Sequence, residues 1–236
     1  MDQTSRELFD TTLTSAAGAL GLEITPEALS KMREHFELVV ETNRVMNLTR
    51  ITDPQEAAVK HYADSLAVLR LVAERNIPVK TVLDIGTGAG FPAIPIAIAR
   101  PECRVTAIDS TRKKADFVRK AASQLELSNV YAEHARAGEW KTESPFCLVV
   151  LRAVSKLGEA LDQSAGYVSE SGYIVAYKSA ELENSEEVAA RKSAKHHRLI
   201  VEPAIQYELA LKGERITRVL HVFASKASSL RRKLLK

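Results

Sequence analysis

The sequence predicts an α/β fold, in which a mainly parallel sheet lies between helices and a helical segment precedes it. Three observations predict this fold. From Lys80 onward, short apolar segments alternate with amphipathic ones, a pattern typical of parallel strands joined by helices. The first 75 residues instead repeat apolar side chains at helical spacing. Near the end, two apolar segments flank a short turn that contains glycine, which favours an antiparallel pair.

Two helices are expected before the sheet. Thr25 can cap the first, and Pro26 suits its first turn, because proline lacks the N–H that a helix start leaves unpaired. Asp53 and Pro54 have the same roles at the start of the second. The apolar faces hold Leu29, Met32, Phe36, Val39 and Val40 in the first helix and Val59, Tyr62, Leu66 and Leu69 in the second. We therefore expect an N-terminal helical cap over residues 1–75.

Seven strands are expected after this cap, the last of them antiparallel. The expected strands are TVLDI (81–85), RVTAID (104–109), NVYAEH (129–134), CLVVLR (147–152), YIVAYK (173–178), HRLIVEPAIQYEL (197–209) and ITRVLHVFAS (216–225). Helices are expected to start near Pro92, Thr111, Lys156 and Glu181. The sheet and its helices form one expected domain over residues 76–226, followed by a short basic tail over 227–236.

Composition excludes several classes of protein. With 45% hydrophobic residues in 236, the chain can bury a core and is not expected to be disordered. A net charge of +3 permits a polyanionic partner, but any RNA footprint must be local. Cys103 and Cys147 are expected to be reduced thiols, and without a CxxC pair we expect no metal. No signal peptide or membrane span is recognisable, so we expect a cytoplasmic protein without a membrane partner.

Three glycines follow the first strand within five residues: Gly86, Gly88 and Gly90. Glycine lets a backbone approach a ligand closely and adopts positive φ at little cost. The helix that follows offers unpaired N–H groups and the positive end of its dipole. Because a parallel sheet binds ligands at the carboxyl ends of its strands, the loop predicts a nucleotide-like cofactor site. The alternative is a tight strand–helix turn without a ligand.

The glycine spacing and two acids indicate which cofactor. Phe91 stands where a dinucleotide fingerprint requires its last glycine, and no Gly-Lys-Ser/Thr follows as in a P-loop. Asp84 instead precedes the first glycine, a pattern of S-adenosylmethionine-dependent methyltransferases, and a carboxylate suits a cationic sulfonium. Asp109 ends the second strand, where an acid can accept hydrogen bonds from both ribose hydroxyls. The alternative for Asp109 is an N-cap of the next helix.

Seven motifs occur in order along the chain. They are NLTRI, KHYADSL, VLDIGTGAGFPAIPIAI, VTAIDSTRKKADFV, LRAVSKL, YKS and GER. From about Leu38 to Ala224 the sequence closely resembles the bacterial ribosomal RNA small subunit methyltransferase G family, also called glucose-inhibited division protein B. The resemblance implies a Rossmann-like class I methyltransferase with a seven-stranded sheet. It also implies transfer of a methyl group from S-adenosylmethionine to N7 of a guanine, in a hairpin loop of the decoding region of 16S rRNA.

The resemblance also assigns roles to individual residues. Besides Asp84, which its place before the loop indicates, the resemblance implies cofactor contacts for Gly86, Thr87, Gly88, Gly90, Phe91, Asp109, Ala137, Gly138 and Arg152. Around the reacting atoms it places Arg152, Lys178, His61, Asp64 and Ser65. One position departs from the family, which often has an acid where this chain has Cys147, so no carboxylate is expected there.

Guanine N7 carries a lone pair and no proton, so we expect no obligatory general base. Because the methylated guanine is cationic, Arg152 is assigned to an anion, either the cofactor carboxylate or an RNA phosphate. The alternative is a strand-end arginine paired with a surface acid. Lys178 is an expected RNA contact, and its alternative is a surface lysine that flanks the core. The alternative for His61, Asp64 and Ser65 is that they are ordinary packed residues of a helix. Three basic clusters could contact RNA: Arg112–Lys114 with Arg119 and Lys120, Arg191–Arg198, and Arg231–Lys233.

The sequence also allows two other functions. One is a methyltransferase that acts on a small molecule or a protein, which the cofactor half alone does not exclude. The other is a non-catalytic rRNA-binding factor of ribosome assembly that keeps the fold. The intact glycine loop and Asp109 favour an enzyme, with the small ribosomal subunit as its partner. We expect a monomer, because nothing in the sequence requires a dimer.

Overall fold

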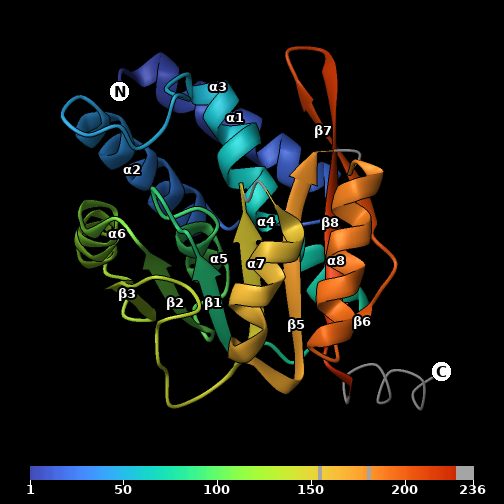
Figure 1. Cartoon of the computed structure of the whole chain (residues 1–236). Coiled ribbons are helices and arrows are strands. Elements are labelled where there is room, and N and C mark those ends of the chain that lie inside the picture. The colour runs from blue at the N-terminus through green and yellow to red at the C-terminus, as the bar shows by residue number, and fades with distance from the viewer. Residues whose placement is uncertain (154–155, 180–181, 227–236) are drawn as a thin grey trace.

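A single sheet lies between two layers of helices in the computed structural model, which describes residues 1–153, 156–179 and 182–226 (Figure 1). The strand order is β3-β2-β1-β4-β5-β8-β6, and β7 also pairs with β8. The strands from β1 to β5 run parallel, and β8 is antiparallel to β5. The strands are β1 (Thr81–Ile85), β2 (Arg104–Asp109), β3 (Val130–His134), β4 (Phe146–Arg152), β5 (Val168–Ser179), β6 (Ile200–Val201), β7 (Ile205–Leu211) and β8 (Glu214–Ala224). The expected parallel sheet with an antiparallel last strand is therefore confirmed.

The sixth expected strand is divided in two, which corrects the prediction of one strand over residues 197–209. β6 ends at Val201, and β7 begins at Ile205 against the same partner, β8. Pro203 lies between them and lacks the N–H that a ladder needs. Between Val201 and Ile205 the chain has one residue more than the segment of β8 that pairs with it, so the interruption is a bulge. Beyond it, the β7–β8 hairpin rises past the neighbouring strand ends (Figure 1).

The N-terminal helices begin where the capping signals predict. Thr25 accepts a hydrogen bond from Ala28 N at 3.2 Å, and Asp53 accepts one from Glu56 N at 2.8 Å. The segment consists of α1 (Gln3–Ala19), α2 (Pro26–Asn43), α3 (Pro54–Ala57), a π-helix η1 (Ala58–Ala63) and α4 (Asp64–Glu74). Two features escaped the sequence analysis: helix α1, and the wider π turn inside what we expected to be one regular helix.

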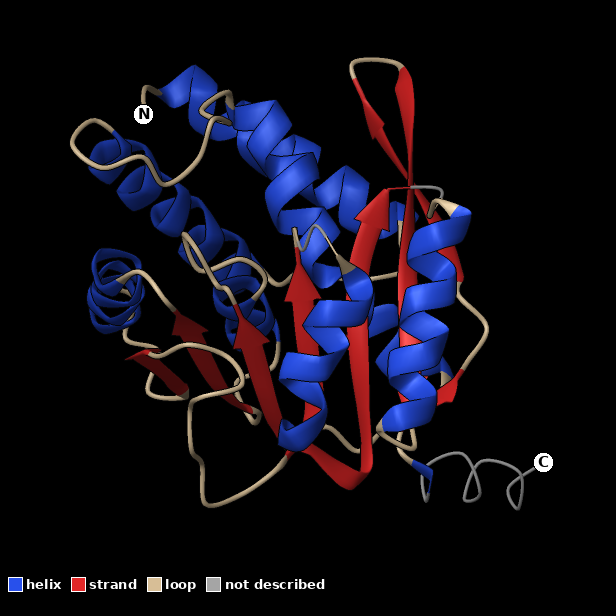
Figure 2. Cartoon of the chain, viewed as in Figure 1, coloured by secondary structure: helices blue, strands red, loops and turns tan. Residues whose placement is uncertain are grey.

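Alternation along the strands divides the core into two clusters. Val82 faces the first cluster and Leu83 the second, because successive side chains of a strand point to opposite faces. The first cluster joins the sheet to the N-terminal helices, α5 (Ala93–Ala99) and α6 (Arg112–Gln124). The second joins it to α7 (Leu157–Ser164), the short η2 (Ala165–Tyr167) and α8 (Asn184–His196). Figure 2 shows helices on both faces of the sheet.

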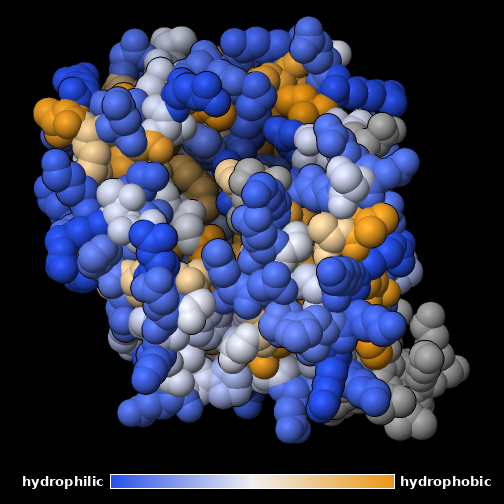
Figure 3. Space-filling view, viewed as in Figure 1, coloured by the Kyte–Doolittle hydropathy of each residue, from blue (hydrophilic) through white to orange (hydrophobic). Residues whose placement is uncertain are grey.

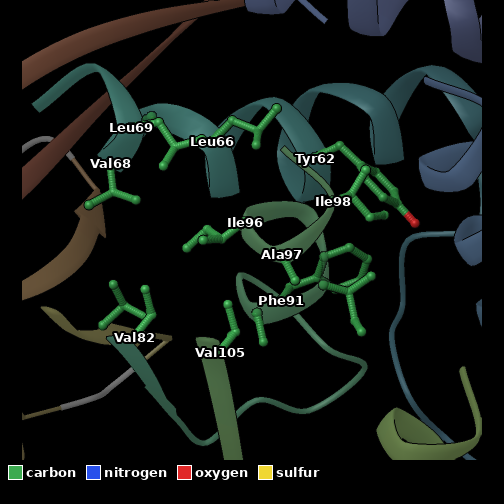
Figure 4. Close-up of a cluster of buried hydrophobic side chains, with 14 of the residues drawn as sticks. Tyr62, Leu66, Val68, Leu69, Val82, Phe91, Ile96, Ala97, Ile98 and Val105 are labelled. Atoms are coloured by element: carbon green, nitrogen blue, oxygen red, sulfur yellow. The ribbon is translucent and has the colours of Figure 1, made fainter. Parts of the chain in front are cut away.

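The N-terminal helices share this core with the sheet. Figure 4 shows Tyr62 and Leu66 packed toward Ile96 and Val82, which lie on α5 and β1. Apolar residues are mainly inside, since hydrophilic side chains dominate the face seen in Figure 3. The expected division at residue 75 falls between α4 and β1 and remains a prediction, and the basic tail 227–236 lies outside the described residues.

The helices of the sheet domain start close to their expected positions. α5, α6 and α7 begin one residue after Pro92, Thr111 and Lys156. α8 begins at Asn184, whereas Glu181 lies outside the described residues. Both cysteines are free thiols, as expected. Among the residues that the structure describes, no helix is both long and apolar enough to cross a membrane.

Candidate active site

The glycine loop lies over the carboxyl ends of β1 and β2. Gly86 N and Thr87 N both donate to Ile108 O, at 2.8 and 3.1 Å, which ties the loop to the second strand. Gly86, Gly88 and Gly90 have φ values of +78°, +59° and +90°, in the region that favours glycine. The expected turn from strand to helix therefore forms, at the expected edge of the sheet.

The three glycines are needed for different reasons. A Cβ at Gly90 would lie 2.7 Å from Ile94 Cγ1 and 3.3 Å from His35 Nε2, so packing excludes any side chain there. Among the described residues, a Cβ at Gly86 would meet nothing within 4 Å, and one at Gly88 only Gly86 O at 4.0 Å. Within this part of the structure Gly86 and Gly88 thus face open space, where a bound molecule can approach the backbone.

Asp109 holds the same loop from the end of β2. Its Oδ2 accepts from Gly88 N at 2.9 Å, and its Oδ1 accepts from Thr111 N at 2.8 Å. The second bond resembles the helix-start role that was the alternative for this residue. Each carboxylate oxygen can accept two hydrogen bonds, so both keep capacity for a ribose hydroxyl.

Asp84 is fully buried at the end of β1. Its Oδ2 accepts from Ala93 N at 3.2 Å, at the start of α5. Its Oδ1 and the hydroxyl of Thr87 are both buried, and the Thr87 side chain acts on the carboxyl as a hydrogen-bond donor. Burial, the larger effect, raises the pKa of the Asp84 carboxyl to about 7. A buried carboxyl beside the glycine loop favours, through its charge, a cationic ligand there such as S-adenosylmethionine.

The segment after β3 lies next to Asp109. Ala135 N donates to Asp109 O at 3.1 Å, so the chain leaves β3 beside the end of β2. Gly138 N donates to the Tyr167 hydroxyl at 3.0 Å, so this backbone donor is not free for an adenine. The adenine-side role of these two residues stays a prediction.

Arg152 ends β4 and joins the sheet to the N-terminal helices. Its Nη1 donates to His61 O at 3.2 Å and to Ser65 Oγ at 3.0 Å, and its Nη2 donates to Lys60 O at 3.1 Å and to His61 Nδ1 at 2.8 Å. The acceptors lie on η1 and on the first turn of α4. Four of the five guanidinium N–H groups are therefore used by the protein itself.

The π turn of η1 supplies acceptors for the guanidinium of Arg152. Its wider spiral is a feature often found at functional sites, and here two of its carbonyl groups, on Lys60 and His61, accept from Arg152. Ser65 Oγ donates to His61 O at 2.5 Å, and Tyr177 OH donates to Ser65 O at 2.8 Å. His61 and Ser65 from the motif KHYADSL and Arg152 from the motif LRAVSKL thus form one hydrogen-bonded group.

His61 is held as a neutral ring. Because its Nδ1 accepts from Arg152, the proton is on Nε2, which donates to Thr49 Oγ1 at 2.8 Å. The ring stacks on Phe91 with centroids 4.4 Å apart. Burial first, and then the charge of Arg152, lower the pKa of His61 to about 3. A ring so placed cannot take up a proton near neutrality.

Asp64 is buried between charged and polar side chains from three parts of the chain. It accepts from Tyr207 OH at 2.7 Å, and its carboxylate oxygens lie 3.5 Å from Arg152 Nη1 and 3.7 Å from Arg218 Nε. Tyr207 and Arg218 were not predicted from the sequence. Both lie on the β7–β8 hairpin, outside the motifs that the sequence analysis singled out.

Lys178 lies at the end of β5 as expected, with its Nζ 2.5 Å from Glu186 Oε1. It lines the same cavity as Arg152. Of the three predicted RNA clusters, Arg119 pairs with Asp116 and Arg191 with Glu187, whereas Arg231–Lys233 lies outside the described residues. The RNA contacts of these clusters stay predictions.

Comparison with known proteins identifies relatives of this chain. The model of the family GidB, rRNA small subunit methyltransferase G, matches residues 28–212. A ribosomal RNA small subunit methyltransferase G from Solibacter usitatus is 40% identical over 183 residues, which cover 77% of this chain and 84% of that protein. One from Lysinibacillus sphaericus is 35% identical over 207 residues, or 86% and 85%.

Solved structures agree with the fold. N-methyltransferase NodS from Bradyrhizobium japonicum, in complex with S-adenosyl-L-homocysteine, matches with a TM-score of 0.53 and 17% identity over 81% of this chain and 99% of that one. An S-adenosylmethionine-dependent methyltransferase from Clostridium acetobutylicum matches with a TM-score of 0.55 and 11% identity over 69% and 91%. At these identities the likeness concerns the fold alone, which is that of class I methyltransferases.

Proposed function

Because this chain belongs to the rRNA small subunit methyltransferase G family, we propose that it transfers a methyl group from S-adenosylmethionine to N7 of a guanine in a decoding-region hairpin loop of 16S rRNA. The single observation that carries the proposal is the match of the family over residues 28–212, which includes the glycine loop and Arg152. We further propose that the protein acts in the cytoplasm as a monomer.

The cofactor half of the site supports a sulfonium nucleoside as the methyl donor. Asp84 would stabilise the cationic end of this molecule through its charge, since its buried carboxyl lies near the end of β1 beside the loop. Asp109 would hold the ribose, and Gly86 and Gly88 let the ligand approach the backbone. When bound, S-adenosylmethionine supplies an electrophilic methyl group.

The remaining residues position the reactants and exclude water. N7 of guanine attacks with its lone pair, so no proton has to leave in the transfer step. The pKa of His61, lowered to about 3, supports this, because the neutral ring holds Arg152 and stacks on Phe91 rather than accepting a proton. Arg152 in turn joins the end of β4 to η1, beside the glycine loop. Catalysis would then come mainly from orientation.

The sequence predicts that Arg152 binds an anion, whereas in the structure most of its N–H groups donate to groups of the protein itself. Arg152 can still attract an anion through its positive charge, because Asp64, the carboxylate beside it, also lies beside Arg218. We therefore propose Arg152 as a positioning residue for the helices that border the site, with a secondary electrostatic role toward substrate.

The test supplies S-adenosylmethionine labelled in its methyl group to the purified protein, with small ribosomal subunits that lack the modification, naked 16S rRNA or small metabolites as acceptors. We expect label in one guanine of the rRNA, and mapping should locate it to N7. Transfer to a metabolite or a protein instead would contradict the proposal. Binding to rRNA without any transfer would favour the assembly factor.

A further inference from the structure

Two arginines share one buried carboxylate at the edge of the sheet where β4 and β5 end. Asp64, 5% exposed, lies 3.5 Å from Arg152 Nη1 through one oxygen and 3.7 Å from Arg218 Nε through the other. Arg218 belongs to this edge because it pairs with Ser179, the last residue of β5. Two positive charges therefore face one negative charge, and Tyr207 already uses the same carboxylate as an acceptor at 2.7 Å.

These side chains line a cavity of about 560 Å³. Its charged lining residues are Arg50, Lys60, Asp64, Arg152, Lys178 and Arg218. Glu56 pairs with Lys60 and Glu186 with Lys178, so among the described residues three carboxylates face five cations. Arg50 is exposed and has no ion pair in the described part of the chain. The described lining of the cavity thus keeps an excess of about two positive charges, which attracts an anion.

Backbone geometry brings these cations together from distant segments. Arg50 comes from the loop after α2, whose Thr49 is held by His61, and Lys60 comes from the π turn. Arg152 and Lys178 end two neighbouring parallel strands. The glycine loop lies over β1 and β2, while this cavity lies over β4, β5 and β8, so the two sites adjoin without coinciding.

We propose that this cavity binds a phosphodiester of the RNA strand, next to the nucleotide that is methylated. The inference rests on the proposed function, because it assigns to that substrate a place beside the reacting atoms. Guanidinium groups bind phosphate oxygens through paired N–H donors, and the Nη atoms of Arg218 make no hydrogen bond within the described residues. A phosphate supplies the missing negative charge, whereas a guanine that becomes cationic would be repelled there. Arg218 and Arg50 are the principal ligands.

The experiment measures equilibrium binding of unmethylated small ribosomal subunits at several salt concentrations. It compares the wild type with Arg218→Gln, Arg50→Gln and a control, Arg104→Gln, at the amino end of β2 on the opposite edge of the sheet. At a fixed moderate salt concentration, we expect Kd to rise about five- to tenfold in the first two variants and to stay unchanged in the control. The slope of log affinity against log salt should shrink by about 0.7 to 0.9 in each, since one phosphate contact is lost.

Arg50→Gln keeps the test decisive if loss of the Asp64 pair unfolds Arg218→Gln, because Arg50 has no ion pair among the described residues. An unchanged salt slope in Arg50→Gln, or an equal change in Arg104→Gln, overturns the proposal. Calorimetry with S-adenosylhomocysteine should give the same affinity in all four proteins. If only Arg218→Gln loses affinity for S-adenosylhomocysteine, and Arg50→Gln binds RNA as the wild type does, the cavity binds the cofactor carboxylate. That result also overturns the proposal.

The salt dependence of binding and the transfer of methyl groups test the phosphate site and the proposed activity separately. If the wild type binds subunits with the expected slope change in the variants but transfers no methyl group, the phosphate site stands and the proposed activity fails. If the wild type methylates rRNA while no variant alters the salt slope, the activity stands and the phosphate site fails.

Discussion

The glycine loop at the ends of β1 and β2 and the arginine cluster at the ends of β4, β5 and β8 are built in opposite ways. In the loop, carboxylates bind backbone N–H groups: Asp84 binds Ala93 N, and Asp109 binds Gly88 N and Thr111 N. These partners are 2 to 21 residues apart in the chain. In the cluster, side chains bind side chains and helix carbonyls, 91 residues apart for Arg152 and His61 and 143 for Asp64 and Tyr207.

The difference has a physical consequence for stability and function. A loop built on backbone contacts depends on where the chain can turn, so its shape is set by the glycine positions and by two packed neighbours, Ile94 and His35. A cluster built on charged side chains depends on each partner being present, because a buried charge without its partner is costly. Substitutions should therefore affect cofactor uptake in the loop, and stability together with substrate binding in the cluster.

The largest effect is expected for Arg152→Ala. The change removes four hydrogen bonds and leaves Asp64 with one arginine, so the free energy of unfolding should fall by about 3 kcal/mol. Methyl transfer should fall by more than about 100-fold, because η1 and Phe91 lose their support beside the site. Urea unfolding and single-turnover transfer to small subunits measure the two effects.

Arg70→Ala is the matched control for this prediction. Arg70 pairs with Glu74 on the exposed face of α4, where ion pairs contribute little. Equal losses in Arg152→Ala and Arg70→Ala would contradict the distinction between the buried cluster and a surface pair. Unchanged uptake of both cofactor and RNA in a folded Arg152→Ala protein would reject its secondary role toward an anion.

The next largest effect concerns the loop. Asp109→Asn replaces one acceptor oxygen by a donor, so Gly88 N or Thr111 N loses its partner and a ribose hydroxyl loses an acceptor. We expect the affinity for S-adenosylhomocysteine to fall about 10- to 100-fold, the effect of losing one or two charge-assisted hydrogen bonds. Calorimetry measures it, with the exposed Asp116→Asn as control. Wild-type affinity in Asp109→Asn would remove this residue from the cofactor site.

A smaller effect should separate the glycines from each other. Gly90→Ala places a Cβ 2.7 Å from Ile94 in the left-handed region, so unfolding should become easier by about 2 to 3 kcal/mol. Gly86→Ala meets open space and carries only the backbone cost of about 1 kcal/mol, but it should weaken cofactor binding. Thermal unfolding and calorimetry on both variants give the comparison. The reverse ranking of stabilities would show that the loop packs differently.

The smallest expected effect is that of pH on the methyl transfer step. The pKa of His61 is lowered from 6.5 to about 3, so the ring stays neutral from pH 6 to 9 and no charge on it changes. At saturating cofactor and RNA, where titration of Asp84 near pH 7 should alter cofactor affinity rather than the transfer step, the single-turnover rate should vary by less than about twofold over this range, since N7 needs no base. A tenfold rise with a midpoint near 6.5 that His61→Gln abolishes would contradict this expectation and make His61 a base.

Local sequence determined the elements of this protein and the position of its cofactor loop. Alternation predicted β1 and β2 to the residue, and caps at Thr25 and Asp53 predicted where α2 and α3 begin, because each depends on neighbours within a few positions. The glycine loop with Asp84 and Asp109 was predicted for the same reason, and the resemblance that these motifs carry led to the family.

Only the tertiary structure decided the rest. The π turn, the division of a strand at Pro203 and the meeting of Arg218 and Tyr207 with Asp64 depend on contacts between segments far apart in the chain. Spacing within a strand predicts on which face of the sheet a side chain lies, but not which charged residue from a distant segment will contact it. Arg152 shows the difference: its place at a strand end follows from the sequence, whereas its partners follow from the packing of helices against the sheet.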